Sequence, residues 1–402
     1  MNEKQHIPSG YKPSPLGIIP EDWEVKRLGE IGDFSKGNGV PKDKIIKDEQ
    51  GHPCLTYGDL YTKYDFVIKD IKSFIDDDVA SESKEIHIGD ICFAGSGETP
   101  EDIGKCAAYI EERTAYAGGD IIILSPNKDI NSIWLSYVLN SDIGGKQRYK
   151  SAQGFSIVHI YPDNLKRIQI PTPTMKEQQR IVSVLSLWDA AIAKQTALIE
   201  QLTLRKRGLM QQLLTGKKRL KGFEGDSFKM MSFDKIANTV NVKAFQVSKS
   251  DYQEKGKTPI VDQGQMFIAA YSDSEKIFKD VPFILFGDHT RIIKWIDFPC
   301  VIGADGVQAI KSKVEMDIKY LYYLLSNTEL PNLGYSRHMG ILKEKVFYVS
   351  TSLDEQKAIA ECLSSADKEI DFAKEKLLHL QKQKRGLMQV LLNGKNRIAN
   401  KI

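Results

Sequence analysis

Two short stretches carry residues whose types and spacing could support catalysis. Gly97–Lys105 suggests a phosphate-binding loop, but the spacing before Gly104-Lys105 is wrong and Cys106 stands where Ser or Thr would bind magnesium. Asp288-His289 could be drawn as an acid–base pair, yet no nucleophile or second carboxylate follows at a useful spacing. The sequence also lacks a plausible metal-binding cluster of a nuclease. We therefore expect no hydrolytic site.

A third stretch, Phe93-Ala-Gly-Ser-Gly97, matches the short F-x-G-x-G pattern of S-adenosylmethionine sites in DNA methyltransferases. Such enzymes also need an Asn/Asp-Pro-Pro-aromatic element at the target base, and the sequence contains none. The glycines are explained more simply by a strand-to-turn junction that needs positive φ. We expect no cofactor site here, and we expect the chain to catalyse nothing.

What remains is polar loops whose side chains can contact phosphates and base edges. One follows a predicted helix over 132–140, and another follows a predicted helix over 318–326. Arginine pairs well with guanine, and glutamine or asparagine with adenine. The alternative is that these residues only solvate their loops. The candidate DNA-binding residues are Arg148, Tyr149, Lys150, Gln153, Phe155, His289, Arg291, Tyr335, Ser336, Arg337 and His338.

An internal repeat marks the elements that must position these loops. Residues 175–219 match residues 353–397 at a constant offset of 178, with 19 identities in 45 pairs. This period is too long for a solenoid and indicates two similar half-chains that end in the same element. Outside the repeat the two halves share little sequence. This is expected for two equivalent domains that keep the same attachment to the repeated element while their exposed surfaces diverge.

Both copies of the repeat are predicted to be long amphipathic helices. Apolar residues recur at 4,3 spacing, which is typical of a coiled coil, and we expect each seam to face the other. The predicted seam residues are Ile181, Leu185, Trp188, Ile192, Ile199, Leu202, Lys206, Leu209, Leu213, Ile359, Leu363, Ile370, Leu377, Leu380, Lys384, Leu387 and Leu391.

The start and stop signals of these helices are repeated as well. Thr174–Glu177 and Ser352–Glu355 have the spacing of capping boxes, in which hydroxyl and carboxylate each bind a backbone N–H. Gly216 and Gly394 suit the left-handed residue that follows a helix. The signals therefore predict helices of equal length.

Polar and small residues interrupt both helices at equivalent positions. Lys206 and Lys384 share one seam position, where a buried lysine fixes register or partner; alternatively, each ammonium snorkels to solvent. Gly208 and Gly386 each cost roughly 1 kcal/mol relative to alanine. Their placement suggests either a close helix approach or a local kink.

The composition is that of an ordinary soluble globular protein. Of 402 residues 41% are hydrophobic and 27% charged, and the net charge of +3 argues neither for nor against nucleic acid. The five cysteines form no C-x-x-C pair, so neither zinc nor disulfides are expected. The first residues are polar and no apolar run approaches about 18 residues, so we expect a cytoplasmic protein that does not bind a membrane.

The fold class expected is α+β, with two similar α/β domains, two long helices and a pseudo-two-fold internal repeat. Short strands bounded by Gly and Asp are predicted in both halves, including 266–271 and 290–296. The expected boundaries are a first domain over 1–173, a first helix over 174–216, a second domain over 217–351, a second helix over 352–394 and a C-terminal tail over 395–402.

Over roughly residues 20–400 the chain resembles the specificity subunit of type I restriction–modification systems. The element from Glu177-Gln-Gln-Arg-Ile to Lys206-Arg-Gly-Leu-Met-Gln-Gln-Leu-Leu-Thr-Gly-Lys, which occurs twice, is similar to that family's two conserved spacer helices. Trp23–Ile31, Gly89–Lys105 and Gly334–Glu344 resemble recurring patterns of its target recognition domains. The second copy departs from the family pattern in having Lys-Ala after Glu355-Gln.

The resemblance implies two target recognition domains held apart by two antiparallel coiled-coil helices. Each domain would read one half of a split, asymmetric site in double-stranded DNA through the major groove. The helices would bind two modification subunits, which carry S-adenosylmethionine and methylate adenine. Restriction subunits, which use ATP and magnesium, would join that complex for translocation and cleavage in antiphage defence. This chain itself would hold no cofactor and no metal.

The sequence leaves other functions to be tested. A helix of ~40 residues is on the order of 60 Å long, which could hold two readers on half-sites about one turn of DNA apart. A coiled-coil assembly or adaptor protein with two protein-binding heads is the alternative, but it gives no reason for two diverged faces with basic and aromatic loops. A stand-alone methyltransferase would need methyl transfer by this chain alone.

Overall fold

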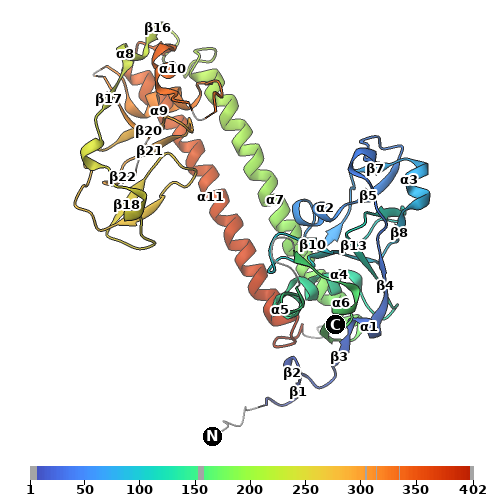
Figure 1. The fold of residues 1–402 in the computed structure, drawn as a ribbon. Helices are drawn as coiled ribbons and strands as arrows, with labels where there is room; N and C mark the ends of the chain where they lie inside the picture. The colour runs from blue at the N-terminus through green and yellow to red at the C-terminus, as the bar shows by residue number, and fades with distance from the viewer. Residues whose placement is uncertain (1–6, 153–157, 304–305, 314, 335, 399–402) are drawn as a thin grey trace. The chain divides into compact units, whose positions relative to one another are not determined.

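The structure is a computed structural model that divides into two compact units. It describes residues 7–152, 158–303, 306–313, 315–334 and 336–398. Residues 1–194 and 377–402 form the first unit, and residues 195–376 form the second. Each unit contains one α/β domain and one segment of each long helix, α7 (Met175–Leu213) and α11 (Leu353–Leu391) (Figure 1). The units therefore differ from the expected boundaries, because each domain packs with parts of both helices.

The first unit is built on a five-stranded sheet in the order β4-β13-β9-β11-β6. Its central strands are continuous apolar runs, as expected for strands covered on both faces. Phe93 and Ile122 pack on α4, whereas Cys92 and Ile123 face the opposite cluster. The strands are β4 (Gly32–Lys36), β6 (Val67–Ile68), β9 (Ile91–Ala94), β11 (Cys106–Tyr109) and β13 (Ile121–Pro126).

Smaller sheets and short helices complete the first unit. A four-stranded sheet has the order β7-β5-β12-β8, and the pairs β1–β2, β3–β15 and β10–β14 are antiparallel. These strands are β1 (Tyr11–Ser14), β2 (Gly17–Pro20), β3 (Glu24–Arg27), β5 (His52–Leu55), β7 (Phe74–Ile75), β8 (Lys84–Ile86), β10 (Ser96–Gly97), β12 (Ala115–Ala117), β14 (Val158–His159) and β15 (Gln169–Thr172). The helices are α1 (Leu28–Ile31), α2 (Tyr57–Thr62), α3 (Asp77–Glu82), α4 (Ser132–Asn140), α5 (Asp142–Ser151) and α6 (Pro162–Leu165).

The second unit repeats this plan with fewer strands. Its main sheet has the order β17-β23-β20-β21, and a smaller one has the order β19-β18-β22. The strands are β16 (Phe228–Ser232), β17 (Ala237–Val240), β18 (Thr258–Val261), β19 (Ala270–Ser272), β20 (Phe283–Gly287), β21 (Ile293–Ile296), β22 (Val301–Ile302), β23 (Val307–Ser312) and β24 (Val346–Ser350). The helices are α8 (Phe233–Ile236), α9 (Ile318–Ser326) and α10 (Met339–Glu344).

The two main sheets share one strand order, which confirms that the halves have the same plan. In each, the strand after the first short helix (β4 or β17) pairs with the last long strand (β13 or β23). That strand pairs in turn with β9 or β20. The helices α4 and α9 match the predicted ranges 132–140 and 318–326. The α+β fold with an internal repeat is therefore confirmed.

Local geometry corrects three details of the sequence-based expectations. The predicted strand over 266–271 begins only at Ala270, so Met266 lies in a loop. The predicted strand over 290–296 begins at Ile293, because Arg291 has a φ of +61°, outside the extended region. Residues 148–151 lie on α5 and not in a loop.

Both long helices end as the sequence predicts. Gly216 has a φ of +66° and Gly394 a φ of +72°, and the N–H of each donates to a carbonyl in the last helical turn. Part of α7 is also long and apolar enough, with a mean hydropathy of 1.2, to cross a membrane. One such helix is not in itself evidence of a membrane span, and its seam packs against protein in both units.

Candidate nucleic-acid interface

Two equivalent polar joints attach the domains to the helices. In the first unit, the Glu177 carboxylate accepts hydrogen bonds from Trp23 Nε1 at 3.0 Å and from Arg397 Nε at 3.0 Å and Nη2 at 2.6 Å. Arg397 also forms a bidentate pair with Asp22, with both distances 2.8 Å. The expected separate tail over 395–402 is thus part of the first unit as far as it is described, to residue 398.

The second unit repeats this joint with residues 178 positions away in the repeat. Glu355, whose side chain is 1% exposed, accepts from Arg219 Nε at 2.7 Å and Nη2 at 2.9 Å. Ser350 donates to the same carboxylate. In both units the glutamate of the predicted capping box therefore binds an arginine, and the reciprocal cap is not its role.

The glutamine after each glutamate completes the joint. Gln178 Oε1 accepts the backbone N–H of Asn131, the N-cap residue of α4, at 2.7 Å. Gln356 Oε1 accepts the backbone N–H of Asp317, the N-cap residue of α9, at 2.8 Å. The repeated glutamine thus fixes the start of each long helix to the equivalent helix of its domain, α4 or α9.

The seam lysine of the first unit is buried in an ion pair. Lys384, with a side chain 6% exposed, donates to the Asp189 carboxylate, which also accepts the Tyr137 hydroxyl. The Lys384 ammonium lies 3.8 Å from the centroid of the Phe66 ring. Burial lowers the pKa of Lys384, and the Asp189 carboxylate opposes that shift. This lysine does not snorkel to solvent.

The second unit contains the same arrangement at equivalent positions. Lys206 Nζ lies 2.5 Å from Asp367 Oδ1, and the Tyr323 hydroxyl donates to Oδ2 of the same carboxylate at 2.7 Å. Within each unit the lysine and the aspartate come from different long helices, which run antiparallel. The pair therefore sets the register between helix segments, the first of the two alternatives that the sequence left open.

The remaining seam positions are buried or half-buried throughout. Ile181 and Leu185 share a core with Leu391 in the first unit, and Leu213 packs with Ile359 in the second. Every predicted seam residue is either buried or half-buried. Further along α7, the side chain of Gln195 donates to the carbonyl of its own repeat equivalent, Ala373, at 2.9 Å.

The candidate DNA-binding residues of the first unit differ in their exposure to solvent. Arg148 is 5% exposed, and its guanidinium donates to the carbonyls of Ile103 and Leu139, so it stabilises the domain and has no surface for a phosphate. Tyr149 is 50% exposed and Lys150 is exposed, both on the last turn of α5. The candidates Gln153 and Phe155 lie outside the described residues.

In the second unit His338 needs the same correction. It is fully buried, its Nδ1 lies 2.9 Å from the carbonyl of Asp288, and its backbone N–H donates to the Asp288 carboxylate at 2.9 Å. The same carboxylate also accepts the N–H of Met339, so it caps α10 and is not an acid–base group. Arg291 Nη1 donates to the carbonyl of Leu330 at 3.2 Å.

Some candidates of the second unit lie at a polar hollow. Arg337 and Ser336 are exposed, and Arg337 lines the hollow together with the carboxyl end of β17 and the start of β23. Tyr335 lies outside the described residues. We name this set the amide hollow; its polar side chains are Asn241, Lys243, Gln246, Asp288, Gln308 and Arg337. Asn241, Lys243 and Gln246 share the segment after β17, but Gln308 and Arg337 come from distant parts of the chain, so no spacing rule could have grouped the whole set.

His289 lies next to the amide hollow. Its backbone N–H donates to Gln263 Oε1 at 3.1 Å. Gly306, with a φ of +72°, lines the hollow and leaves room for both side chains, because a Cβ there would lie 2.5 Å from Gln263 and 2.7 Å from His289. The structure therefore brings His289 and Arg337 to one surface.

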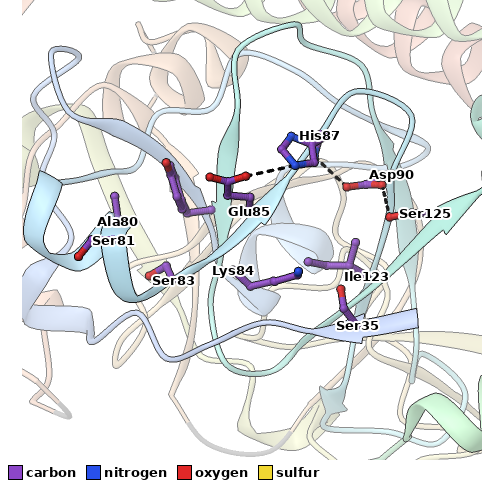
Figure 2. Close-up of a pocket in the computed structure, with 11 residues that line it drawn as sticks. Ser35, Ala80, Ser81, Ser83, Lys84, Glu85, His87, Asp90, Ile123 and Ser125 are labelled. Atoms are coloured by element: carbon purple, nitrogen blue, oxygen red, sulfur yellow. Dashed lines mark hydrogen bonds and ion pairs between the residues drawn. The ribbon is translucent and has the colours of Figure 1, made fainter. Parts of the chain in front are cut away.

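A second polar hollow, in the first unit, carries residue types found in catalytic triads (Figure 2). His87 Nε2 lies 3.2 Å from Glu85, while the Asp90 carboxylate accepts the His87 backbone N–H at 2.8 Å and the Ser125 hydroxyl at 2.7 Å. Ser125 thus donates directly to Asp90, without the histidine that lies between serine and aspartate in a catalytic triad. Asp90 instead stabilises the turn that contains Gly89, because its carboxylate accepts the His87 backbone N–H.

The stretch Phe93–Gly97, which matches a cofactor-binding pattern in sequence, has structural contacts in the first unit. Phe93 is fully buried in the core of the first unit, and the N–H of Gly95 donates to the carbonyl of Asp120 at 2.7 Å, as in a structural turn. Within the described residues, no group of three or more His, Cys, Asp or Glu side chains could hold a metal ion.

Comparisons with known proteins agree with this arrangement. Residues 20–204 match the family model described as type I restriction modification DNA specificity domain. The chain is 29% identical to the putative type I restriction enzyme MjaX specificity subunit of Methanocaldococcus jannaschii, over 96% of this chain and 97% of that protein. It is 27% identical to the MjaVIII specificity subunit of the same organism, over 95% of each.

Solved structures give the same fold. The crystal structure of the type I restriction–modification S subunit from M. genitalium superposes with a TM-score of 0.58 at 17% identity, covering 98% of this chain and 99% of that one. At this identity the likeness shows the fold alone. Together with the matching domain and the full-length relatives, it leads to one conclusion. The chain is similar over nearly its whole length to type I restriction–modification specificity subunits, and residues 20–204 match their DNA specificity domain.

Proposed function

We propose that this chain reads a split, asymmetric site in double-stranded DNA, one half with each domain. The observation that carries the proposal is that the two domains are attached to the helices in the same way but expose different polar surfaces. Both domains are fixed to the helices by the same contacts, Asn131 to Gln178 and Asp317 to Gln356. Their exposed polar surfaces differ, so two domains with the same attachment would be two different readers.

The amide hollow supplies the groups for one reader. Amide side chains such as that of Gln308 recognise adenine, and an exposed arginine such as Arg337 recognises guanine or a phosphate. The exposed Tyr149 and Lys150 of the first unit are suited to backbone contact and stacking, and they stay candidates for the other reader.

We also propose that the outer faces of the helices dock two modification subunits. Most residues that are identical in the two copies of the repeat are explained by contacts within this chain, because they lie in the seams, the joints or the lysine–aspartate pairs. Arg207 and Arg385 are not: both are exposed at equivalent positions. Gly208 and Gly386 would place a Cβ in open space, so neither close approach nor contact within this chain explains them. A partner packing closely on each glycine would.

The same proposal assigns the chemistry to the partners. Modification subunits would supply S-adenosylmethionine, and restriction subunits would supply ATP and magnesium, in the cytoplasm where the DNA lies. This chain would be a non-catalytic reader, in keeping with the structural roles of Asp288 and Asp90.

Methylome sequencing of cells that express the chain with its modification subunits tests the reading role. The wild type is expected to give a two-part motif with an unspecified spacer. The double variant Arg337→Ala/Gln308→Ala should relax one half of the motif and keep the other, whereas Lys229→Ala, on exposed β16, should change nothing. A methylation pattern independent of this chain would overturn the proposal.

Binding of purified complex to DNA separates the proposal from an adaptor role. Selective capture of the motif, weakening as salt rises, is expected for a DNA reader. Footprinting should protect two patches with an open spacer between them. An adaptor with two protein-binding heads would show no sequence preference at any salt concentration.

A further inference from the structure

We infer that the loop 262–267 of the second domain is an apolar wedge that enters its DNA half-site and unstacks a base step. This inference rests on the proposed function and adds deformation of the DNA to reading of its edges. We call the segment the wedge loop. Three observations carry it: the exposure of its tip, the rigidity of its base and its place beside the amide hollow.

The tip of the wedge loop exposes two large apolar side chains side by side. Met266 is 71% exposed and Phe267 is 52% exposed. Adjacent exposed residues of this size expose more apolar surface to water than the scattered single residues common on proteins. Strand pairing does not explain them, because β19 begins three residues later, at Ala270.

A buried lysine holds the wedge loop in place. Lys294 Nζ donates to the carbonyl of Asp262 at 2.7 Å and to the carbonyl of Met266 at 2.6 Å, and its side chain is 5% exposed. Burial lowers the pKa of this ammonium. Burying a cation under a surface loop costs free energy unless hydrogen bonds replace its lost hydration. Here they fix the loop directly under its apolar tip.

The other side of the wedge loop is held by the loop after β20. The Thr290 hydroxyl donates to the carbonyl of Gln263 at 2.7 Å, and Gln263 Oε1 accepts from the His289 N–H. The Asp262 carboxylate accepts the N–H of Gly264 at 2.8 Å. The tip is therefore held on a braced support. The Phe267 ring makes a T-shaped contact with the Phe298 ring, 5.9 Å between centroids, and still leaves half of its surface exposed beside Met266.

The wedge loop is continuous with the amide hollow. Gln263 and His289 both lie against Gly306, which lines that hollow beside Arg337. Moving from the hollow to the tip, the surface changes from cationic and amide groups to apolar ones. A DNA half-site offers the matching sequence of partners: phosphates and base edges first, then the faces of the bases.

The chemistry of the tip fits bases better than it fits a protein partner. Apolar side chains, Phe and Met among them, wedge between base steps and kink the duplex, recovering the unstacking cost through wider contact. That mechanism needs a rigid wedge beside groups that fix the backbone, and both are present. A protein partner would need a larger apolar patch than two side chains.

The first domain carries a different element at the equivalent position. Its β5 pairs in parallel with β12 as β18 pairs with β22, so the segment after β5 corresponds to the wedge loop. That segment is the helix α2 (Tyr57–Thr62), not a loop. The inference therefore predicts an unstacked step in one half-site only.

The test measures deformation of the DNA by the complete complex of this chain with its modification subunits. DNA carrying the motif, labelled at both ends for energy transfer and carrying 2-aminopurine at successive half-site positions, is compared free and bound. The variants are Met266→Ala/Phe267→Ala and the matched control Met230→Ala, an exposed methionine of β16 that is 65% exposed.

The double variant is expected to bend the DNA less, to lose 2-aminopurine fluorescence at one step, and to bind the motif roughly tenfold or more weakly. The Met230→Ala control should match the wild type. Any base flipped by a modification subunit stays flipped in all three and is an internal reference. Equal bending and equal fluorescence for the double variant and the wild type would overturn the inference.

Two further outcomes separate this inference from the proposed function. If wild-type complex captures the motif selectively but shows no unstacked step besides the methylation target, the wedge is wrong and the reading role stands. If the double variant instead loses its modification subunits on purification, Met266 and Phe267 form a protein contact and the inference fails. Absence of any sequence preference in the wild type would remove the proposed function itself.

Discussion

Lys384 and Asp189 form an ion pair inside the helix seam, between residues that are 195 positions apart in the chain. The repeat equivalents of both residues, Lys206 and Asp367, form the same pair in the second unit with the two helices exchanging roles. A tyrosine of the adjacent domain, Tyr137 in the first unit, donates to the aspartate in each case. One motif thus ties together both helices and a domain.

Removal of the aspartate tests this tie. Asp189→Ala leaves the Lys384 ammonium buried without its carboxylate and is expected to lower the free energy of unfolding by about 1–3 kcal/mol. Lys384→Met removes the charge together with its desolvation cost and should cost less. A double-mutant cycle of the two, followed by urea unfolding, measures the coupling. Strictly additive losses would show that the pair does not act as a unit.

The joint at the C-terminal end gives a second prediction. Arg397→Ala is expected to cost about 1 kcal/mol, a value discounted because its side chain is 40% exposed. Arg397→Lys should recover little, since lysine lacks the fork that binds two carboxylates. Hydrogen exchange should rise near β3 and the end of α11. The equivalent change, Arg219→Ala, should raise exchange near β16 instead; the same exchange pattern for both variants would contradict separate joints.

The sequence predicts the repeated parts of this molecule far better than its surfaces. The long helices and their glycine ends follow from periodicity and from the glycine signal at a helix C-terminus, which are local. The amide hollow does not, because Gln308 and Arg337 meet only through the fold. Arg148 and His338 have suitable chemistry for DNA contact, but burial commits both to internal hydrogen bonds. Residue type alone does not show whether a side chain is buried and already hydrogen-bonded within the domain.

The helix glycines should separate stability from assembly. Gly208→Ala and Gly386→Ala meet no atom within 4 Å, so each is expected to stabilise the folded chain by about 0.5–1 kcal/mol. If partners pack closely there, the same variants should carry fewer modification subunits through purification. Thermal unfolding and the subunit ratio by mass measure both effects. Normal assembly with the added methyl groups would rule out docking on the glycines.

Buried thiols predict how stability falls at alkaline pH. Burial raises the pKa of Cys106 to about 12 from its usual 9.0, so the folded state keeps a proton that the unfolded chain releases. The stability that this difference provides is present below pH 9.0 and is lost as pH rises toward 12. Cys106→Ala should therefore flatten the loss in urea midpoint above pH 9.0, and Cys362→Ala, on half-buried surface, serves as the control. An unchanged slope in Cys106→Ala would contradict the assignment.

A single methyl group should decide whether the second domain reads DNA through the surface around Gly306. Gly306→Ala places a Cβ 2.5 Å from Gln263 at a φ of +72°, a backbone strain of about 1–2 kcal/mol before any clash. The wedge loop and His289 must then move apart, which should relax one half of the methylated motif while the other half stays intact. Gly340→Ala, in α10 of the same domain with open space around its Cβ, should leave the motif unchanged. Loss of both halves in Gly306→Ala would indicate general unfolding, so urea unfolding of that variant is measured alongside, and an intact motif with a folded protein would place the reading surface elsewhere.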